Sequence, residues 1–135
     1  MRADIQPAEI KPLLPSLSIL EVSGDAPLQL RVRLAGTRLR DYLGVETTGR
    51  MVSDFELGDQ RSYWEAAYHE VLIGARPAQG VVPLTPWAQP HVFQFWLRLP
   101  LMDEDGAIVM VLGHDAFLQS EKARALADRA NLRIA

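Results

Sequence analysis

The segment 33-RLAGTRLRDYLGVETTGR-50 decides between a nucleotide-binding loop and a connection from a strand to short helices. A phosphate-binding loop needs clustered glycines at the start of a helix and a nearby lysine. This segment spreads its glycines over positions 36, 44 and 49 and contains no lysine. We therefore expect a connection, in which Gly36 and Thr37 turn the chain into a helix, Gly44 ends that helix, and residues 48–50 begin the next one.

The residues before this segment predict a β-hairpin. Residues 23–27, SGDAP, have turn chemistry, because glycine and aspartate tolerate unusual backbone angles and proline is excluded from a central ladder. Beyond the turn, apolar and polar residues alternate strictly, which is typical of a half-buried strand. The residues expected on the inner face are Leu28, Leu30, Val32 and Leu34.

The residues after the segment predict one long helix. Asp59 is its expected N-cap, and Gly74 and Pro77 end it. The helical spacing of the apolar side chains predicts one buried face, which comprises Trp64, Ala67, Val71 and Ala75 with the flanking Tyr68 and Leu72.

Three further strands complete the pattern. Pro83 and Pro86 confine the strand at 79–86 to a sheet edge, because proline lacks a ladder donor. Residues 92–102 alternate, and we expect Phe93, Phe95, Leu97, Leu99 and Leu101 to face inward. Residues 103–106 form a hairpin loop, and residues 107–114 are apolar on both faces, which predicts a central strand. A last helix follows, with Asp115 or Ser120 as its cap.

Composition excludes several classes of function. The chain has 135 residues, which suits one domain with a substantial core. Its net charge of −3 gives no general attraction to nucleic acid or anionic lipid. The sequence has no signal-peptide pattern and no apolar run near the ~18–20 residues of a membrane span. We expect a cytoplasmic protein whose partners include neither nucleic acid nor a membrane.

This order of elements resembles a PAS domain, and it is most similar to a bacterial PAS subfamily common in alphaproteobacteria. Members of that subfamily open like 4-DIQPAEIKPLLPSLSILEV-22 and continue with a GT…G…TGR segment, here Gly36-Thr37, Gly44 and Thr48-Gly49-Arg50. Their long helix stops as this one does at Gly74–Pro77. The resemblance covers residues 4–115 and implies an α+β fold. Its five-stranded antiparallel sheet has the order 2-1-5-4-3, with helices on one face and the strands at 28–35 and 79–86 on the two edges.

The resemblance also implies a domain division and a role. We expect an N-terminal cap segment at 1–17, a PAS-like core at 18–115 and a C-terminal helix or tail at 116–135. The role is that of a stand-alone sensory or regulatory domain in signal transduction, which binds a small molecule or a protein partner and has no catalytic activity of its own. We expect a homodimer, because the outer sheet face needs covering, and a signalling partner protein in trans that contacts residues 118–130.

PAS domains enclose a pocket between the inner sheet face and the helices, which gives candidate binding residues. The predicted ligand-binding residues are Tyr42, Phe55, Trp64, Tyr68, Leu72, Phe93, Phe95, Leu97, Val109 and Val111. Most are apolar, which suits a small apolar ligand. The same side chains can equally fill a core without a ligand, and both interpretations remain open.

No cofactor is predicted. The flavin and photoactive-yellow classes of PAS-like domain need a reactive cysteine, and this chain has none. The haem-binding class uses a histidine about ten residues before the glycine that ends the long helix, where this chain has Trp64, whereas His69 lies five residues before Gly74. His91 and His114 do not form a metal site either, because His114 is expected opposite residue 95, which separates the two by roughly 13 Å.

A second interpretation belongs to another class of protein. A small α+β barrel of the ketosteroid isomerase kind has a similar length and a curved sheet around an apolar pocket. Its catalytic base would be an acid on a strand position that faces the pocket. The inward positions predicted above contain no acid, and the two interpretations also differ in strand order.

Overall fold

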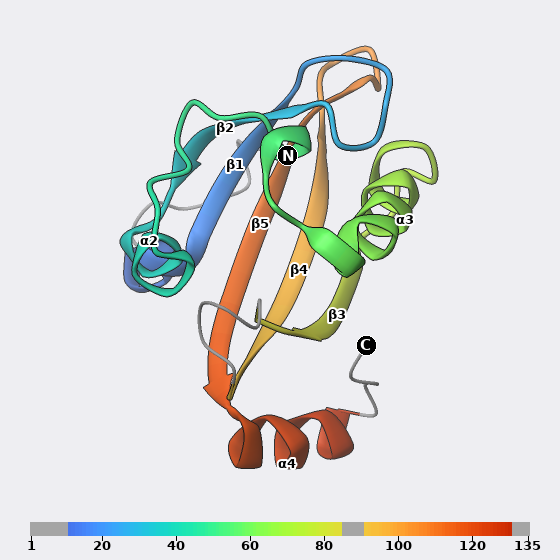
Figure 1. Cartoon of the computed structure of the whole chain (residues 1–135). Coiled ribbons are helices and arrows are strands. Elements are labelled where there is room, and N and C mark those ends of the chain that lie inside the picture. Colours follow the sequence, from blue (N-terminus) through green and yellow to red (C-terminus); the bar gives the residue numbers. More distant parts are fainter. Residues whose placement is uncertain (1–10, 85–90, 131–135) are drawn as a thin grey trace.

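Five antiparallel strands form one sheet in the order β2-β1-β5-β4-β3 (Figure 1). The computed structural model describes residues 11–84 and 91–130. The strands are β1 (Leu17–Val22), β2 (Leu30–Ala35), β3 (Ala78–Pro83), β4 (Val92–Met102) and β5 (Ile108–Gln119). The predicted α+β fold and strand order are confirmed. Pro83 lies in the edge strand β3, as its missing N–H requires; Pro86 lies outside the described residues.

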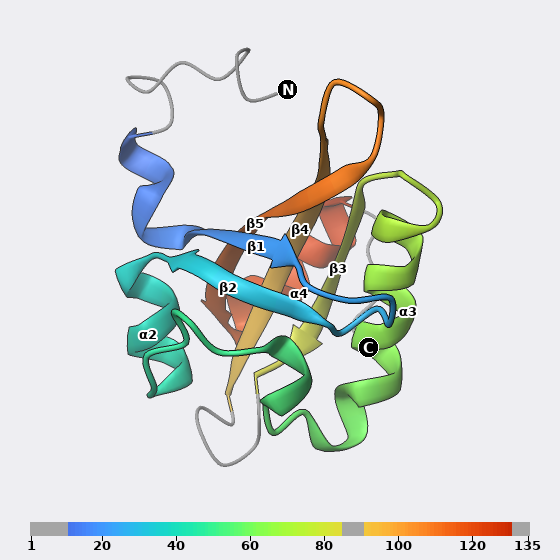
Figure 2. The ribbon, with the colours of Figure 1, turned by 90° about the horizontal axis from the view of Figure 1, so that it is seen from above.

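The helical segments lie between and beyond the strands. They are η2 (Lys11–Ser16), α2 (Thr37–Leu43), η3 (Val52–Asp54), η4 (Gly58–Gln60), α3 (Arg61–Leu72) and α4 (Ser120–Ala130). Figure 2 shows α2, η3 and α3 on the same side of the sheet. Of the helices described, none is long and apolar enough to cross a membrane.

The predicted β1–β2 hairpin is present, but a bulge changes which side chains it buries. Leu30 and Val32 are buried, whereas Leu34 is 47% exposed. The register shifts between Ile19 and Leu20, so that Val32 pairs with Leu20 while Leu34 pairs with Ile19. A bulge breaks the strict alternation of faces, and the expectation that Leu34 faces inward is therefore wrong.

The segment 33–50 connects β2 to the helices, as expected. α2 begins after Gly36 and ends at Gly44, whose φ of 81° is the left-handed cap that glycine adopts without strain. Gly36 is needed for a different reason, because a Cβ there would collide with the backbone of Leu14 and Pro15 in η2. Residues 48–50 do not begin a helix. They form a turn along β2, where the Gly49 N–H donates to the Val32 carbonyl, and η3 starts only at Val52.

The long helix is shorter than its sequence pattern. α3 starts at Arg61, and Asp59 lies in the preceding η4 rather than at the N-cap, which Gln60 occupies without a side-chain cap bond. The helix buries Trp64, Tyr68 and Val71 against the sheet. These side chains belong to the main apolar cluster with the inner faces of β1 and β2.

β4 turns the opposite face to the helices from the one predicted. Gln94, Trp96 and Arg98 are buried on the helix side. The alternate residues of the strand, which the sequence placed inside, lie half-buried on the outer face, and they are Phe93, Phe95, Leu97 and Leu99. Both faces of β4 contain apolar side chains, so alternation alone did not fix which of them faces the core.

β5 is longer than predicted and is the central strand. It continues to Gln119, so Asp115 is a strand residue and not a helix cap. Its register pairs His114 with Leu97 rather than residue 95, which separates His114 and His91 by six residues, roughly 20 Å along the strand. α4 follows at once from Ser120, with Ala123 and Ala127 buried and with contacts to β4 and β5. The expected division at 115/116 falls inside β5, and the domain division itself remains a prediction.

Candidate functional site

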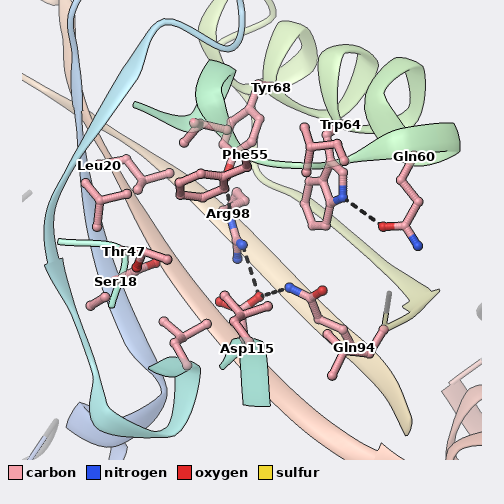
Figure 3. A pocket seen from close by; sticks show the side chains of 17 residues that line it. Ser18, Leu20, Thr47, Phe55, Gln60, Trp64, Tyr68, Gln94, Arg98 and Asp115 are labelled. Carbon is pink, nitrogen blue, oxygen red and sulfur yellow. Dashed lines mark hydrogen bonds and ion pairs between the residues drawn. The ribbon is translucent and has the colours of Figure 1, made fainter. Parts of the chain in front are cut away.

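A cavity of about 110 Å³ lies between the inner sheet face and the helices. Figure 3 shows its lining side chains converging from β1, β4, β5, α3 and the segment before η4. Most of the wall is apolar. The lining residues are Ser18, Leu20, Val32, Ala35, Leu39, Leu43, Thr47, Val52, Phe55, Leu57, Gln60, Trp64, Tyr68, Leu84, Gln94, Arg98 and Asp115.

An ion pair between two neighbouring strands forms the polar end of this cavity. Arg98 of β4 and Asp115 of β5 are joined through Nη2 and Oδ1 at 3.0 Å, and their side chains are 7% and 0% exposed. Burial alone would lower the pKa of the Arg98 guanidinium, but the Asp115 carboxylate and the Tyr68 hydroxyl outweigh it and hold that pKa above its usual range. The guanidinium is therefore a permanent charge beside the cavity.

Neighbouring side chains hold both partners of the pair. Arg98 Nε donates to the Tyr68 hydroxyl at 3.0 Å, and Nη1 donates to the Leu97 carbonyl at 2.9 Å. Gln94 Nε2 donates to the same Asp115 oxygen, Oδ1, at 2.7 Å (Figure 3). The remaining carboxylate oxygen, Oδ2, is buried and has no hydrogen-bond partner among the described residues.

Gly113 makes the space that the guanidinium occupies. A Cβ at this position would lie 3.1 Å from Arg98 Nη1 and would collide with the Ser18 hydroxyl. Ser18 of β1 is the register partner of Gly113 of β5, so the two small residues open a gap in the inner face. Arg98 of β4 is also a register partner of Gly113, and its guanidinium lies against Gly113 in that gap.

Aromatic rings close one side of the cavity. The Trp64 and Trp96 rings lie 5.0 Å apart, and the Arg98 guanidinium is 5.5 Å from the Trp64 ring. This distance is within the range of cation–π attraction. Trp64 Nε1 donates to Gln60 Oε1, and Gln60 Nε2 donates to the Pro83 carbonyl. The wall is therefore fixed by both packing and hydrogen bonds.

The structure brings only some of the predicted binding residues to this cavity. Phe55, Trp64 and Tyr68 line it. Tyr42 stacks on Phe117 at a centroid distance of 4.4 Å, in the second apolar cluster, and Leu72 packs against the main one. Neither residue is part of the lining.

The predicted sheet residues lie elsewhere. Phe93, Phe95 and Leu97 are on the outer face, where Phe95 and Leu97 line a separate shallow groove. Val109 is 37% exposed near the β4–β5 hairpin, and Val111 is fully buried in the core without lining the cavity. The lining from β4 and β5 is instead Gln94, Arg98 and Asp115. Gln94 and Arg98 alternate with the residues predicted to face inward, and Asp115 was predicted as a helix cap.

Asp115 lines the cavity, so an acid does face the pocket. The expectation that the inward positions contain no acid is therefore wrong. The sequence could have indicated this only through an acid on the strand next to Arg98. To find that acid, the register between β4 and β5 must be known. Among the described residues, no group of three or more metal-ligating side chains forms a candidate metal site.

Comparison with known proteins gives the class to which this fold and pocket belong. A family model described as "PAS domain" matches residues 1–115, and the chain belongs to this family. A search of curated proteins finds no match.

Solved structures agree on the fold. The PAS domain of BvgS from Bordetella pertussis is 16% identical and has a TM-score of 0.62, with 96% of this chain and 97% of that one covered. A Rhodobacter sphaeroides light-oxygen-voltage (LOV) protein is 18% identical, with a TM-score of 0.61 and coverage of 92% and 77%. A LOV domain described with a flavin analogue is 13% identical, with a TM-score of 0.67 and coverage of 92% on both sides. The barrel alternative is thereby excluded as the fold, and the PAS fold suggests a sensory or regulatory role.

Proposed function

We propose that this PAS domain is a sensor that binds a small, mainly apolar molecule in the cavity bounded by Arg98 and Asp115. The observation that carries the proposal is a cavity with apolar walls and a few convergent polar groups at one end, which is the usual character of a small-molecule site. Of the residues predicted from sequence, Phe55, Trp64 and Tyr68 belong to the proposed site. Binding rather than catalysis is the proposed role, because the carboxylate in the pocket is held in an ion pair with Arg98.

The size of the cavity limits the ligand. A cavity of about 110 Å³ is comparable with the engineered apolar cavity of roughly 150 Å³ that accepts benzene. The proposed ligand is therefore the size of a single ring. The chain lacks the cysteine for a flavin adduct.

The test combines native mass spectrometry of the purified protein with NMR titration of ring-sized compounds. Binding is expected to shift the resonances of Trp64 and Tyr68. Ala35→Leu extends a lining side chain into the cavity and should abolish those shifts. Ala130→Leu, at an exposed α4 position, is the matched control and should keep them. Unchanged binding in Ala35→Leu, or no binding of any compound to the wild type, would contradict the proposal.

A second proposed interaction is dimerisation through the outer sheet face, with output to a signalling partner protein in trans. The outer face of β4 and β5 is half-buried and apolar, and it comprises Phe93, Phe95, Leu97, Leu99, Met110, Leu112, Ala116 and Leu118, with His114 as its one titratable side chain. We propose a second copy of this chain as the partner of this face. An isologous interface brings identical patches together, and this patch brings no like charges into contact. α4 already packs Ala123 and Ala127 inside the chain, so that small-residue stripe is not free for a partner.

The oligomeric state tests this second proposal. Light scattering should give a dimer for the wild type at tens of micromolar. Leu97→Arg should give a monomer, because it places a charge in the patch. Ile73→Arg changes a 67% exposed side chain beyond the end of α3 and should leave the dimer intact. A monomeric wild type, or a dimer that survives Leu97→Arg, would refute the proposed interface.

A further inference from the structure

The unused carboxylate oxygen of Asp115 gives information about the chemistry of the ligand. Oδ1 accepts two hydrogen bonds, from Arg98 and Gln94, while Oδ2 is buried without a partner among the described residues. A buried charged oxygen without a donor is costly, and such groups in native proteins call for an explanation. Asp115 lines the cavity, and the terminal torsion of a carboxylate is broad, so a small rotation presents Oδ2 to a molecule bound there.

The hydrogen-bond capacity at this end of the cavity favours a donor. Arg98 already uses its Nε, Nη1 and Nη2 groups on Tyr68, Leu97, His114 and Asp115. Gln94 uses its amide nitrogen on Asp115, which leaves its carbonyl oxygen as a second acceptor. Asp115 Oδ2 and Gln94 Oε1 are free acceptors, and the hydroxyl groups of Tyr68, Ser18 and Thr47, which also line the cavity, can donate or accept. The one buried oxygen without a partner among the described residues is Asp115 Oδ2, so the unmet requirement is that of an acceptor for a donor.

The charge at the site favours a neutral ligand. Arg98 and Asp115 neutralise each other inside the fold, with almost no exposure to water. An anion would lie against the Asp115 carboxylate, and a cation would compete with Arg98 for it, so either leaves a buried charge uncompensated. A neutral molecule keeps the pair intact.

We propose that the ligand is a neutral, ring-sized molecule that donates an O–H or N–H hydrogen bond to Asp115, with its ring packed against Trp64 and Phe55. Phenolic and indolic compounds have this chemistry. The inference rests on the proposed small-molecule function. It adds that the ligand must carry a hydrogen-bond donor and that Asp115 accepts this bond.

The sharpest test changes the ligand and leaves the protein unaltered. Phenol and toluene have nearly the same shape, and only phenol has a donor. A cavity without an accessible acceptor prefers toluene, because a hydroxyl loses its hydrogen bonds to water on entry. With Asp115 as acceptor, wild-type protein should bind phenol at least about tenfold more tightly than toluene in NMR titrations. Benzoate should bind more weakly than phenol.

The outcomes separate the two proposals. Equal binding, a preference for toluene or a preference for benzoate would overturn the donor requirement while leaving a small-molecule pocket in place. If neither phenol nor toluene binds, the pocket proposal fails and the donor proposal fails with it. A clear preference for phenol supports both.

A double variant assigns the preference to the ion pair. Arg98→Met with Asp115→Leu removes both charges at once, and a change of this kind is often tolerated by a buried pair. Circular dichroism verifies its fold. The variant should still bind toluene and should lose the tenfold preference for phenol. If the preference persists in the folded double variant, Asp115 is not the acceptor. If the variant does not fold, the wild-type comparison still decides the donor requirement.

Discussion

Replacing either Arg98 or Asp115 alone leaves the other charge buried without its partner. The two side chains are 7% and 0% exposed, so water does not replace the lost contact. Breaking a buried pair from one side costs about 3–5 kcal/mol. The free energy of unfolding of a whole domain is about 5–15 kcal/mol, so Arg98→Met or Asp115→Leu should remove a large share of it.

The double variant should lose less stability than the two single variants together. It contains no uncompensated charge, but it leaves Gln94 Nε2 and the Tyr68 hydroxyl without their partners, each at a cost of about 1–3 kcal/mol unless water reaches it. At the midpoints of these ranges the two single variants together lose about 8 kcal/mol and the double variant about 4, so the coupling energy between positions 98 and 115 should be about 4 kcal/mol. Urea unfolding of the four proteins, monitored by circular dichroism, gives this energy as a double-mutant cycle.

An exposed pair in the same sheet provides the control. Arg33 and Glu21 are joined at 2.9 Å, nearly the distance of the buried pair, but their side chains are 59% and 41% exposed. Exposed pairs contribute about 0–1 kcal/mol. If the cycle at 98 and 115 gives a coupling no larger than the cycle at 33 and 21, or if Asp115→Leu alone stabilises the protein, the argument from burial is refuted.

Three further changes test other parts of the structure. Gly113→Ala should destabilise by about 1–3 kcal/mol in urea unfolding, because its Cβ meets the Arg98 guanidinium; a neutral effect would mean that the gap in β5 is not needed. Burial raises the pKa of Tyr63, although the hydrogen bond from Trp96 opposes this shift. The stability due to the neutral hydroxyl is therefore present below pH ~10, and it is lost as the pH rises through the pKa of Tyr63 in the folded state. Tyr63→Phe should therefore show a shallower loss of stability above pH 10, and an identical alkaline slope would contradict this. Ala123→Asp places a charge at a fully buried α4 position and should unfold α4, measured as lost helical signal, whereas unchanged signal would show that α4 does not depend on this contact.

Local signals in the sequence predicted the connections and the edge position of β3. Turn residues define the hairpin at 23–27, proline defines the edge strand, and Gly44 ends α2 where its left-handed φ is required. These features depend on a few neighbouring residues each. The family resemblance then supplied the topology, which the structure confirms.

The site was predicted only in part, because its chemistry depends on pairs that are distant in sequence. The alternation pattern predicts that Arg98 faces outward. Only the bond to Asp115, 17 positions along the chain, explains why it is buried. Alternation rules place polar residues in water, and here Gln94, Arg98 and Asp115 are buried together because each satisfies another. Phe95 faced the wrong way in the prediction for the same reason, since its apolar row lies on the outer face. The β1–β2 bulge that exposes Leu34 has no local signal of comparable strength.

β5 continues into α4 without a loop, so a movement of Asp115 at the pocket is passed on directly to α4. Asp115 lies four residues before Gln119, roughly 13 Å along the strand, and α4 begins at the next residue. A loop would absorb a tilt in its own dihedral angles, but from Asp115 to Gln119 β5 is paired residue by residue with β4. α4 has 11 residues, a lever of about 16 Å. A rotation of about 5° at its root displaces its far end by about 1.4 Å over such a length, which is enough to change how a side chain fits a neighbouring surface.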